Sequence, residues 1–293
     1  MVAEANNLYS NREIRISPDK RWLVATSDSA DVRLYDMQNL DKAPVIFEEH
    51  EGHVRDIEFM PDGSGIITLG FDQRIYFYDF NRSRLLKRTE NRVNRIKVAP
   101  DNRTIYAGTS DGKIIRISMA DMSETVVVEA SDMRQITSLE LNPDGTKLAF
   151  GGLTGYVIMY DLLKNESIQE LYGHTARISD VDFSNKGDLV VTSSWDGTMQ
   201  MWNMNNLDDL PYYFTDNGQN YVWDVDFSPD DKYLVVGTRG GVLKKWAVSN
   251  ADLSEQICQH LTRNMTEEEW DRYVSDEVDY RTTCESITNR DNS

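Results

Sequence analysis

A short turn motif recurs along this chain and constrains its fold more than any other feature of the sequence. An alternating apolar segment runs into Pro-Asp-Gly or into a close variant of it. The last apolar residue before each turn sets the register, and these residues are Ile16, Phe59, Val98, Leu141, Phe183 and Phe227. They recur about every 42 residues, a period typical of repeat architectures. The sequence therefore predicts six units, at residues 11–42, 43–83, 84–123, 124–166, 167–209 and 210–250.

The unit at residues 167–209 indicates most clearly what each unit folds into. Apolar and polar residues alternate over three runs, which turn residues separate, at 178–183, 189–194 and 198–203. Such alternation indicates strands joined by hairpins rather than helices. The linking segments provide a fourth strand, expected at 45–47, 85–87, 125–128, 168–171 and 212–214. Four short strands per repeat predict an all-β fold of propeller blades, since a two-sheet sandwich would not repeat the same turn chemistry six times.

Dipeptides at two points of the repeat resemble those of the WD-repeat family. Gly52-His53 and Gly173-His174 are similar to the family's Gly-His, and its Trp-Asp has counterparts in Tyr35-Asp36, Tyr78-Asp79, Tyr160-Asp161 and Trp202-Asn203. The resemblance covers residues 11–249. It implies a six-bladed WD-repeat β-propeller over residues 1–250, or six blades of a larger one, with a short helical extension after it.

The resemblance also implies a buried, hydrogen-bonded tetrad in two units. Its expected members are His174, Thr192, Asp196 and Trp202 in one unit, and His53, Thr68, Asp72 and Tyr78 in another. A buried imidazole needs one donor and one acceptor, and such a chain of residues provides both. A catalytic triad is the alternative, but a fold repeat does not usually build a catalytic set twice. Units with Ser29, Thr154 and Gly240 at the Asp position are expected to lack the network.

The two ends of the chain depart from the repeat. The last unit lacks a fourth strand of its own, and an unpaired edge is a liability. Either residues 3–9 provide that strand, or the chain is the tail of a longer protein. Residues 251–293 form an acidic extension with helical spacing, in which Thr266 and Glu269 predict a capping box. This extension resembles the tail of bacterial WD-repeat proteins associated with STAND-type signalling ATPases or caspase-like modules, which implies an effector module upstream or on a partner.

The two cysteines, Cys258 and Cys284, leave three alternatives open. Buried free thiols are the preferred interpretation, a disulfide is the second, and a metal pair with His260 is the third, for which a convincing fourth ligand is missing. Such sparse use of cysteine fits a reducing compartment, so a cytoplasmic location is expected.

Composition and missing motifs limit the functions that the chain is expected to have. The formal net charge is −18, from 31 basic and 49 acidic residues, so phosphate backbones and anionic lipid would repel the chain. No phosphate-binding loop, zinc-protease motif or nucleophile elbow occurs. We therefore expect no catalysis, cofactor, metal, nucleic acid, membrane or small-molecule substrate.

Two positions per unit are expected to reach the mouth of the central channel, where loops over a rigid ring bind partners. Arginines and aromatic residues concentrate at these positions and in nearby loops, and they are Phe71, Trp195, Tyr221, Trp223, Arg239, Arg55, Arg177 and Arg92. Exposed Trp, Tyr and Arg dominate interface energies. The sequence thus predicts a non-catalytic scaffold or sensor that binds an acidic peptide or protein. The alternatives are a domain that restrains an attached ATPase or protease, and a propeller enzyme, which would need acids or histidines at this mouth.

Overall fold

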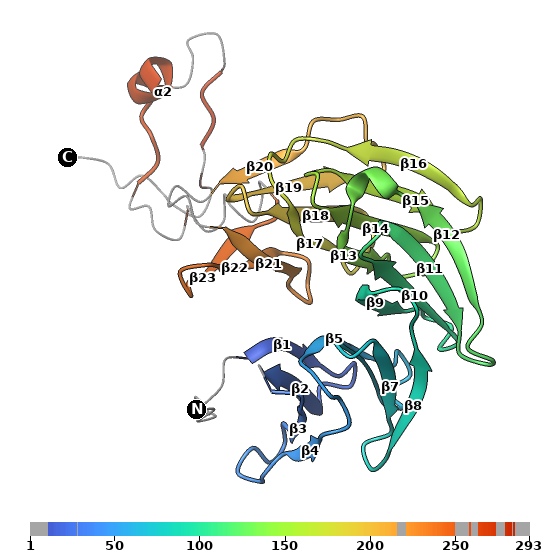
Figure 1. Cartoon of the computed structure of the whole chain (residues 1–293). Coiled ribbons are helices and arrows are strands. Elements are labelled where there is room, and N and C mark those ends of the chain that lie inside the picture. Colours follow the sequence, from blue (N-terminus) through green and yellow to red (C-terminus); the bar gives the residue numbers. More distant parts are fainter. Residues whose placement is uncertain are drawn as a thin grey trace.

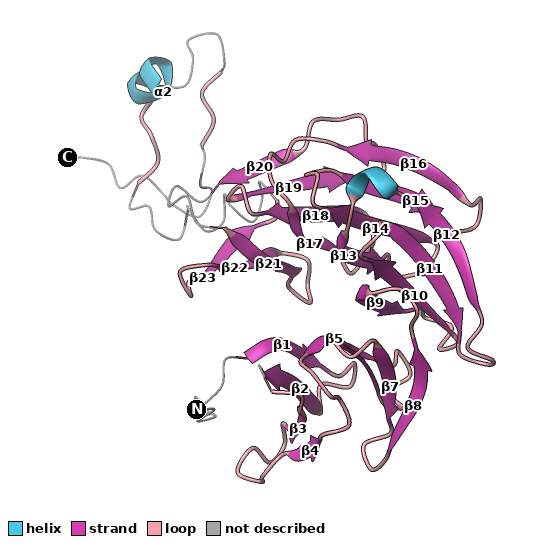
Figure 2. Cartoon of the chain, in the orientation of Figure 1, coloured by secondary structure: helices cyan, strands magenta, loops and turns pink. Residues whose placement is uncertain are grey.

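Six antiparallel sheets make up the computed structural model and form a β-propeller (Figures 1 and 2). The structure describes residues 11–27, 29–215, 221–249, 258, 263–273, 279–282 and 284. Blade one contains β1 (Asn11–Ile16), β2 (Trp22–Ser27), β3 (Val32–Asp36) and β4 (Val45–Phe47). Blade two contains β5 (Val54–Phe59), β6 (Ile66–Gly70), β7 (Arg74–Tyr78) and β8 (Ser83–Arg88). Blade three contains β9 (Val93–Val98), β10 (Thr104–Thr109), β11 (Lys113–Ser118) and β12 (Glu124–Glu129).

The remaining three blades continue the same order, from an inner strand outwards. Blade four contains β13 (Ile136–Leu141), β14 (Lys147–Gly152), β15 (Val157–Asp161) and β16 (Glu166–Leu171). Blade five contains β17 (Ile178–Phe183), β18 (Leu189–Ser194), β19 (Thr198–Asn203) and β20 (Tyr212–Thr215). Blade six contains β21 (Val222–Phe227), β22 (Tyr233–Thr238) and β23 (Leu243–Ala247), and no fourth strand among the residues that the structure describes. A single-turn 3-10 helix, η1 (Ser131–Met133), precedes β13.

The Pro-Asp-Gly turns connect the inner strand of each blade to the second strand. Their aspartate accepts a hydrogen bond from a backbone N–H two residues later, as Asp62 does from Ser64 over 2.9 Å and Asp144 from Thr146 over 2.8 Å. The next residue has a positive φ of 73° at Gly63 and 71° at Gly145. Glycine adopts this conformation at little cost, which explains its place in the motif.

Period-two alternation gives every blade two apolar faces, and the core consists of the layers between blades. The forward face of a blade, as we use the term, is turned towards the next blade in chain order, and the backward face towards the preceding one. Ile67 and Leu69 on the forward face of blade two pack against Ile96 and Ile105 on the backward face of blade three. The inner strands therefore carry apolar residues between blades and polar residues into the channel.

The expected fourth strands are confirmed, whereas two expectations about the ends fall outside the described residues. The segments at 45–47, 85–87, 125–128, 168–171 and 212–214 lie in β4, β8, β12, β16 and β20. The strand expected at residues 3–9 and the helical spacing of residues 253–261 cannot be compared with the structure. The capping box is present before α2 (Glu267–Tyr273), because the N–H of Glu269 donates to the Thr266 hydroxyl over 3.2 Å and the N–H of Thr266 donates to Glu269 over 3.0 Å.

The preferred interpretation of the cysteines is wrong, because Cys258 and Cys284 form a disulfide. Asn264 positions Cys284 by pairing with its backbone in both directions. The Asn264 amide nitrogen donates to the Cys284 carbonyl over 3.1 Å, and the Cys284 N–H donates to the Asn264 oxygen over 2.8 Å. The two Cα atoms are 5.5 Å apart, a usual separation for a disulfide. The metal alternative is excluded as well, and the sparse cysteines no longer support a cytoplasmic location, which stays a prediction.

Membrane insertion by a helix finds no support in the described part of the chain. None of the helices there has the length and apolar character that crossing a bilayer requires.

Candidate functional site

A network of hydrogen bonds around a histidine connects the strands of blade five. His174 Nδ1 lies 3.2 Å from an Asp196 oxygen and 2.9 Å from the Thr198 hydroxyl, and His174 Nε2 lies 2.9 Å from the Thr192 hydroxyl. Burial acts to raise the pKa of Asp196, but hydrogen bonds from His174, Thr198 and the backbone of Thr175 outweigh it and keep that pKa below its ordinary value. Every polar atom of the imidazole has a partner within the blade, which is the pattern of a structural group.

The matching network of blade two contains His50, and the expectation that His53 belongs to it is wrong. His50 Nε2 lies 2.8 Å from the Thr68 hydroxyl, and His50 Nδ1 lies 3.1 Å from Asp72. A Cβ at Gly70 would come within 2.3 Å of the His50 ring, so this glycine gives the imidazole its space. His53 instead lies at the mouth, edge-on to Phe71 with ring centroids 5.9 Å apart. The sequence held the correct signal, because His50 and His174 both precede their aspartate by 22 residues.

Replacing His50 with alanine is expected to lower the free energy of unfolding by roughly 1–3 kcal/mol, because it leaves Thr68 and Asp72 without their buried partner. His53→Ala is the matched control and should cost clearly less, since no hydrogen bond of the network involves it. Urea unfolding of both variants measures the difference. A larger loss in the His53 variant would contradict the assignment.

Trp202 and Tyr78 fill equivalent positions but do not complete the expected tetrads. Both side chains are buried, Trp202 between blades four and five and Tyr78 between blades one and two. The indole N–H of Trp202 has no hydrogen-bond partner among the described residues, and the hydroxyl of Tyr78 lies near Thr68 without forming a well-aligned hydrogen bond. The network is therefore a histidine, a threonine and an aspartate above a packed aromatic ring.

One group of the predicted partner-binding residues assembles at the mouth of blades five and six. Trp195 stacks on Tyr221 with ring centroids 5.2 Å apart and planes 14° from parallel, and the Trp223 ring meets Trp195 edge-on at 5.2 Å. The Arg177 guanidinium lies 4.3 Å from the Trp195 ring centroid, and that of Arg239 lies 5.1 Å from the Tyr221 centroid. We call these five residues the tryptophan cluster.

A second group forms on blades two and three. The Arg55 guanidinium lies 3.8 Å from the ring centroid of Phe71, and that of Arg92 lies 5.3 Å from it. Arg55 also donates a hydrogen bond to the side chain of Asn94. Phe71 is 44% exposed although two cations cover it. We call Arg55, Phe71 and Arg92 the phenylalanine cluster.

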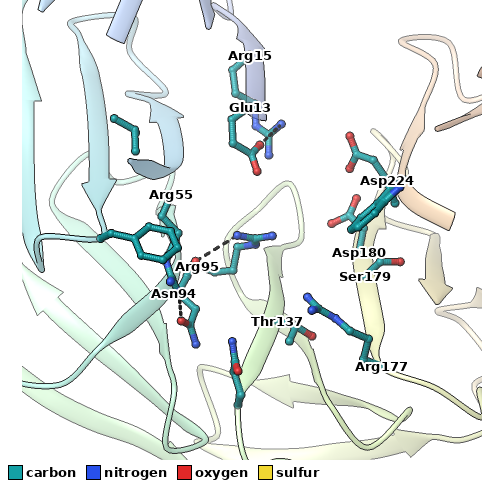
Figure 3. Close-up of a pocket in the computed structure, with 14 residues that line it drawn as sticks. Glu13, Arg15, Arg55, Asn94, Arg95, Thr137, Arg177, Ser179, Asp180 and Asp224 are labelled. Atoms are coloured by element: carbon teal, nitrogen blue, oxygen red, sulfur yellow. Dashed lines mark hydrogen bonds and ion pairs between the residues drawn. The ribbon is translucent and has the colours of Figure 1, made fainter. Parts of the chain in front are cut away.

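The two clusters face one another across a single cavity of about 540 Å³. Arg55 and Phe71 line it on one side, and Arg177 and Trp223 on the other. Figure 3 shows Arg177, just before β17, directed into this space, whereas Arg55 of β5 lies on the other side beside Asn94, with Thr137 between the two arginines. The structure thus brings all eight predicted residues to one mouth. Four of them line the cavity, and the other four, Arg92, Trp195, Tyr221 and Arg239, lie behind these in the two clusters.

The channel below the mouth is acidic, which the sequence interpretation did not anticipate. Lys97 bridges Glu58 and Glu140, with 2.7 Å to each carboxylate. Burial raises the pKa of Glu140 to about 7, against the lowering effect of Lys97, and raises that of Glu13 to about 6. Burial and neighbouring carboxylates also raise the pKa values of channel acids on β17 and β21, namely Asp180, Asp182 and Asp226. Arginines thus stand at the rim of the mouth, while Glu13, Asp180 and Asp224 line the same cavity and carboxylates outnumber the cations in the channel below.

Replacing Glu140 with glutamine is expected to stabilise the protein by roughly 2 kcal/mol at about pH 8 and to change little near pH 4.5. The pKa of Glu140 is raised from its ordinary 4.5 to about 7, so between these values the folded chain binds more protons than the unfolded chain. Its stability therefore falls as pH rises through this window, whereas glutamine does not titrate and Glu58 still pairs with Lys97. Urea unfolding across this range measures the slope, with the exposed Glu166→Gln as control. An unchanged slope would contradict the burial of Glu140.

The comparisons with known proteins agree with this geometry. The family model described as WD domain, G-beta repeat matches residues 43–79, 165–203 and 211–247. Three segments of the chain therefore match the WD40 repeat. Each match starts at the outer strand of one blade and ends at the third strand of the next, so the WD40 repeat straddles two blades.

The chain is also similar in sequence to several named proteins. The chain is 27% identical over 223 residues to the LST8 homologue of Drosophila melanogaster, covering 71% of this chain and 69% of that protein. It is 25% identical over 202 residues to the target of rapamycin complex subunit LST8 of Saccharomyces cerevisiae, covering 66% of each. It is also 25% identical over 190 residues to the guanine nucleotide-binding protein subunit beta-1 of Nicotiana tabacum, covering 64% of this chain and 41% of that subunit. These relatives are eukaryotic, so a bacterial origin and the likeness of the tail to signalling ATPases stay predictions.

Sequence reasoning missed the charged residues that line the lower part of this WD40 channel. They lie one and three positions after the residue that stands four before the register residue of each inner strand, as Arg95 and Lys97 do after Asn94, although blade four has Ser138 at the first of these positions. The signal was present, because every inner strand from β5 to β21 carries a charged residue at the second of these positions. The sequence interpretation considered only the position at the mouth.

Proposed function

We propose that this chain is a non-catalytic interaction platform, which binds a protein segment bearing carboxylates across the mouth of its propeller. The relatives' names support a role of this kind, since two of the proteins are called subunits, of the target of rapamycin complex and of a guanine nucleotide-binding protein. The regulatory alternative, in which the partner is an attached effector, stays a prediction.

The observation that carries the proposal is the tryptophan cluster. Trp223 is 48% exposed in the part of the mouth that lines the cavity. Behind it, the indole N–H of Trp195 and the Nε of Arg177 are buried and have no hydrogen-bond partner among the described residues. Buried donors usually have an acceptor. These two donors have none among the described residues, and the exposed Trp223 ring in front of them is the part of the cluster that a bound segment can contact directly.

Charge favours an acidic segment at this mouth. The chain as a whole has a formal charge of −18, yet four arginines surround the cavity entrance, two in each cluster. None of the described carboxylates lies within ion-pair distance of Arg92, Arg177 or Arg239. Guanidinium groups on aromatic faces bind carboxylates in a planar geometry. A peptide with alternating acidic and apolar residues would fit both chemistries.

Selection from a random peptide display library against the full chain tests the proposal. We expect the selected peptides to be rich in Asp and Glu beside an aromatic or large apolar residue, and to bind more weakly as salt concentration rises. Binding should be lost in the double variant Arg55→Ala/Arg177→Ala. Selected peptides that lack carboxylates, or that bind this variant as well as the parent, would contradict the proposal.

A further inference from the structure

An exposed apolar run lies on the outside of blade five, at the end of the loop that follows β19 and at the start of β20. Leu210 is 93% exposed, Tyr212 is 56% exposed and Tyr213 is 60% exposed, with the half-buried Pro211 between them. Single exposed apolar residues are usual on protein surfaces, but a contiguous group of large ones marks a contact surface. We call Leu210, Pro211, Tyr212 and Tyr213 the outer patch.

The outer patch lies far from the mouth of the propeller. β19 begins at Thr198, soon after the mouth residue Trp195, and ends at Asn203. The loop that carries Leu210 follows Asn203, so the length of β19, about 20 Å for six residues, separates this loop from the tryptophan cluster. The strand β20 forms the outer edge of blade five (Figure 1). A ligand on the outer patch therefore leaves the mouth free.

The edge formed by β20 lacks the charges that the other long outer strands carry. β8, β12 and β16 each contain at least two charged residues, a usual protection of sheet edges against contact with other proteins. β20 reads Tyr-Tyr-Phe-Thr, and the uncharged β4 has only three residues. Strand pairing aligns Tyr212 with Arg84, Thr125 and Gln169 of blades two, three and four. Blade five thus places an aromatic ring where these blades place a polar side chain.

Packing and hydrogen bonds hold the loop before β20 in place. Leu207 is buried in the layer between blades four and five, and its carbonyl accepts a hydrogen bond from the Gln169 side chain over 3.1 Å. The Asn205 N–H donates to the Asn203 side chain over 2.9 Å. A surface that is held in this way loses little conformational freedom when a ligand binds to it. The loop therefore buries Leu207 and presents Leu210 on a fixed support.

A hollow of about 670 Å³ lies beside the outer patch and combines apolar with acidic side chains. The residues that line it are Asn203, Asp208, Asp209, Leu210, Pro211 and Tyr212. Both aspartates are exposed, and none of the described cations lies within ion-pair distance of either. The hollow therefore offers an incoming ligand an apolar wall and two carboxylates.

Charge decides which kind of partner fits this surface. The chain has a formal net charge of −18, so nucleic acid and anionic lipid would be repelled. A second copy of the chain would bring the same acidic surface against itself in a symmetric contact, and like charges facing one another oppose association. The acidic extension at residues 251–293 has the wrong charge as well. A basic polypeptide segment has the complementary charge.

We propose that the outer patch binds a basic segment of a partner protein, in which one large aliphatic or aromatic side chain lies between lysine or arginine residues. The apolar side chain enters the hollow and packs against Leu210 and Tyr212, and the flanking cations pair with Asp208 and Asp209. A tyrosine ring can also receive a cation on its face. The proposal goes beyond the binding at the mouth and depends on none of the mouth residues.

Peptide selection against a chain with an altered mouth tests this proposal. The full chain carries Arg55→Ala/Arg177→Ala, so that the mouth does not compete, and a random peptide display library is selected against it. We expect peptides with at least two lysine or arginine residues around one large apolar residue, and we expect their affinity to fall as salt concentration rises. Selected peptides without basic residues, or the absence of any selected peptide, would overturn the proposal.

Substitutions in and near the outer patch locate the site of these peptides. Leu210→Ser should weaken binding of one selected peptide by roughly tenfold or more in isothermal titration calorimetry, and Asp208→Asn/Asp209→Asn should weaken it and flatten its salt dependence. Leu163→Ser is the matched control, because Leu163 is 79% exposed in the turn between β15 and β16, next to Lys164.

Both leucine variants should keep the thermal midpoint of the parent, since neither side chain belongs to the core. The calorimetric comparison therefore reports binding rather than folding. Unchanged affinity in the Leu210 variant, or an equal loss in the Leu163 variant, would overturn the proposal. Either result leaves the proposed binding at the mouth untouched, because the peptides are selected against a chain that lacks two of the mouth arginines.

Discussion

Trp202→Ala is expected to lower the free energy of unfolding by about 3–5 kcal/mol. The Trp202 ring is buried in the layer between blades four and five, where it packs with Ala149, Leu171 and Phe183. Its removal leaves a cavity in a layer that connects two blades, and the surrounding strands cannot close it without breaking their ladders. Equilibrium unfolding in urea at constant pH measures the loss. A variant with the parent's unfolding midpoint would show that the ring is not part of the core.

Trp202→Phe is the matched control for this prediction. The indole N–H has no hydrogen-bond partner among the described residues, so phenylalanine loses only volume and should cost clearly less than alanine. If the N–H completed a buried tetrad, phenylalanine would also forfeit that bond and leave an unpaired group on the histidine network. Equal losses in the two variants would restore the tetrad and contradict the geometry described above.

Trp223→Ala is expected to weaken binding of the selected acidic peptides by roughly 30-fold or more, equivalent to about 2 kcal/mol. The Trp223 side chain lines the cavity, is 48% exposed and rests edge-on against Trp195. A bound segment would cover its free face and exclude water from the neighbouring Arg177. Isothermal titration calorimetry with one selected peptide measures the change in dissociation constant.

The thermal stability of the Trp223 variant should stay close to that of the parent, because an exposed ring contributes little to the core. Tyr213→Ala is the control, since Tyr213 is similarly exposed but lies on the outer strand β20. It should leave both affinity and stability unchanged. If Trp223→Ala instead unfolds the chain, or if Tyr213→Ala weakens binding equally, the mouth is not the binding surface.

The fold was predictable because each repeat carries its own local signals. Period-two alternation and the Pro-Asp-Gly turn fix the three inner strands, and the same turn then sets the register of Phe59 against Ile66 or Phe183 against Val190. The outer strands were also predictable although many of their residues are exposed. In each of the first five units one linking segment remains after the three hairpin strands, and this segment forms the outer strand of the blade.

The candidate site was predictable at the mouth and less so beneath it. Equivalent positions in the repeat brought Trp195, Trp223 and Arg177 together as expected. His50 was missed because the prediction relied on the Gly-His dipeptide, which His53 shares with His174. The 22-residue separation from the histidine to its aspartate would have indicated His50 instead. Lys97 and Glu140 were missed because their ion pair joins the neighbouring inner strands β9 and β13 of two blades, a contact that no single repeat contains.

The disulfide and the exposed apolar residues of blades one and six show what local patterns cannot give. Cys258 and Cys284 meet through Asn264, a contact between segments that no periodicity relates. The exposure of Leu243 and Ile16 follows from how far six blades extend around the axis. Repeats that are nearly identical in pattern therefore differ most at the two ends of the array.

Hydrogen exchange of the full chain, with and without a selected acidic peptide, tests the central claim most directly. When the peptide is bound, we expect slower exchange of backbone amides in the loops around Phe71, Trp195 and Tyr221 and at the start of β21. We expect no change in the outer strands β8, β12 and β16. Protection confined to those outer strands, with the mouth unaffected, would contradict the claim that partners bind where the two arginine and aromatic clusters meet.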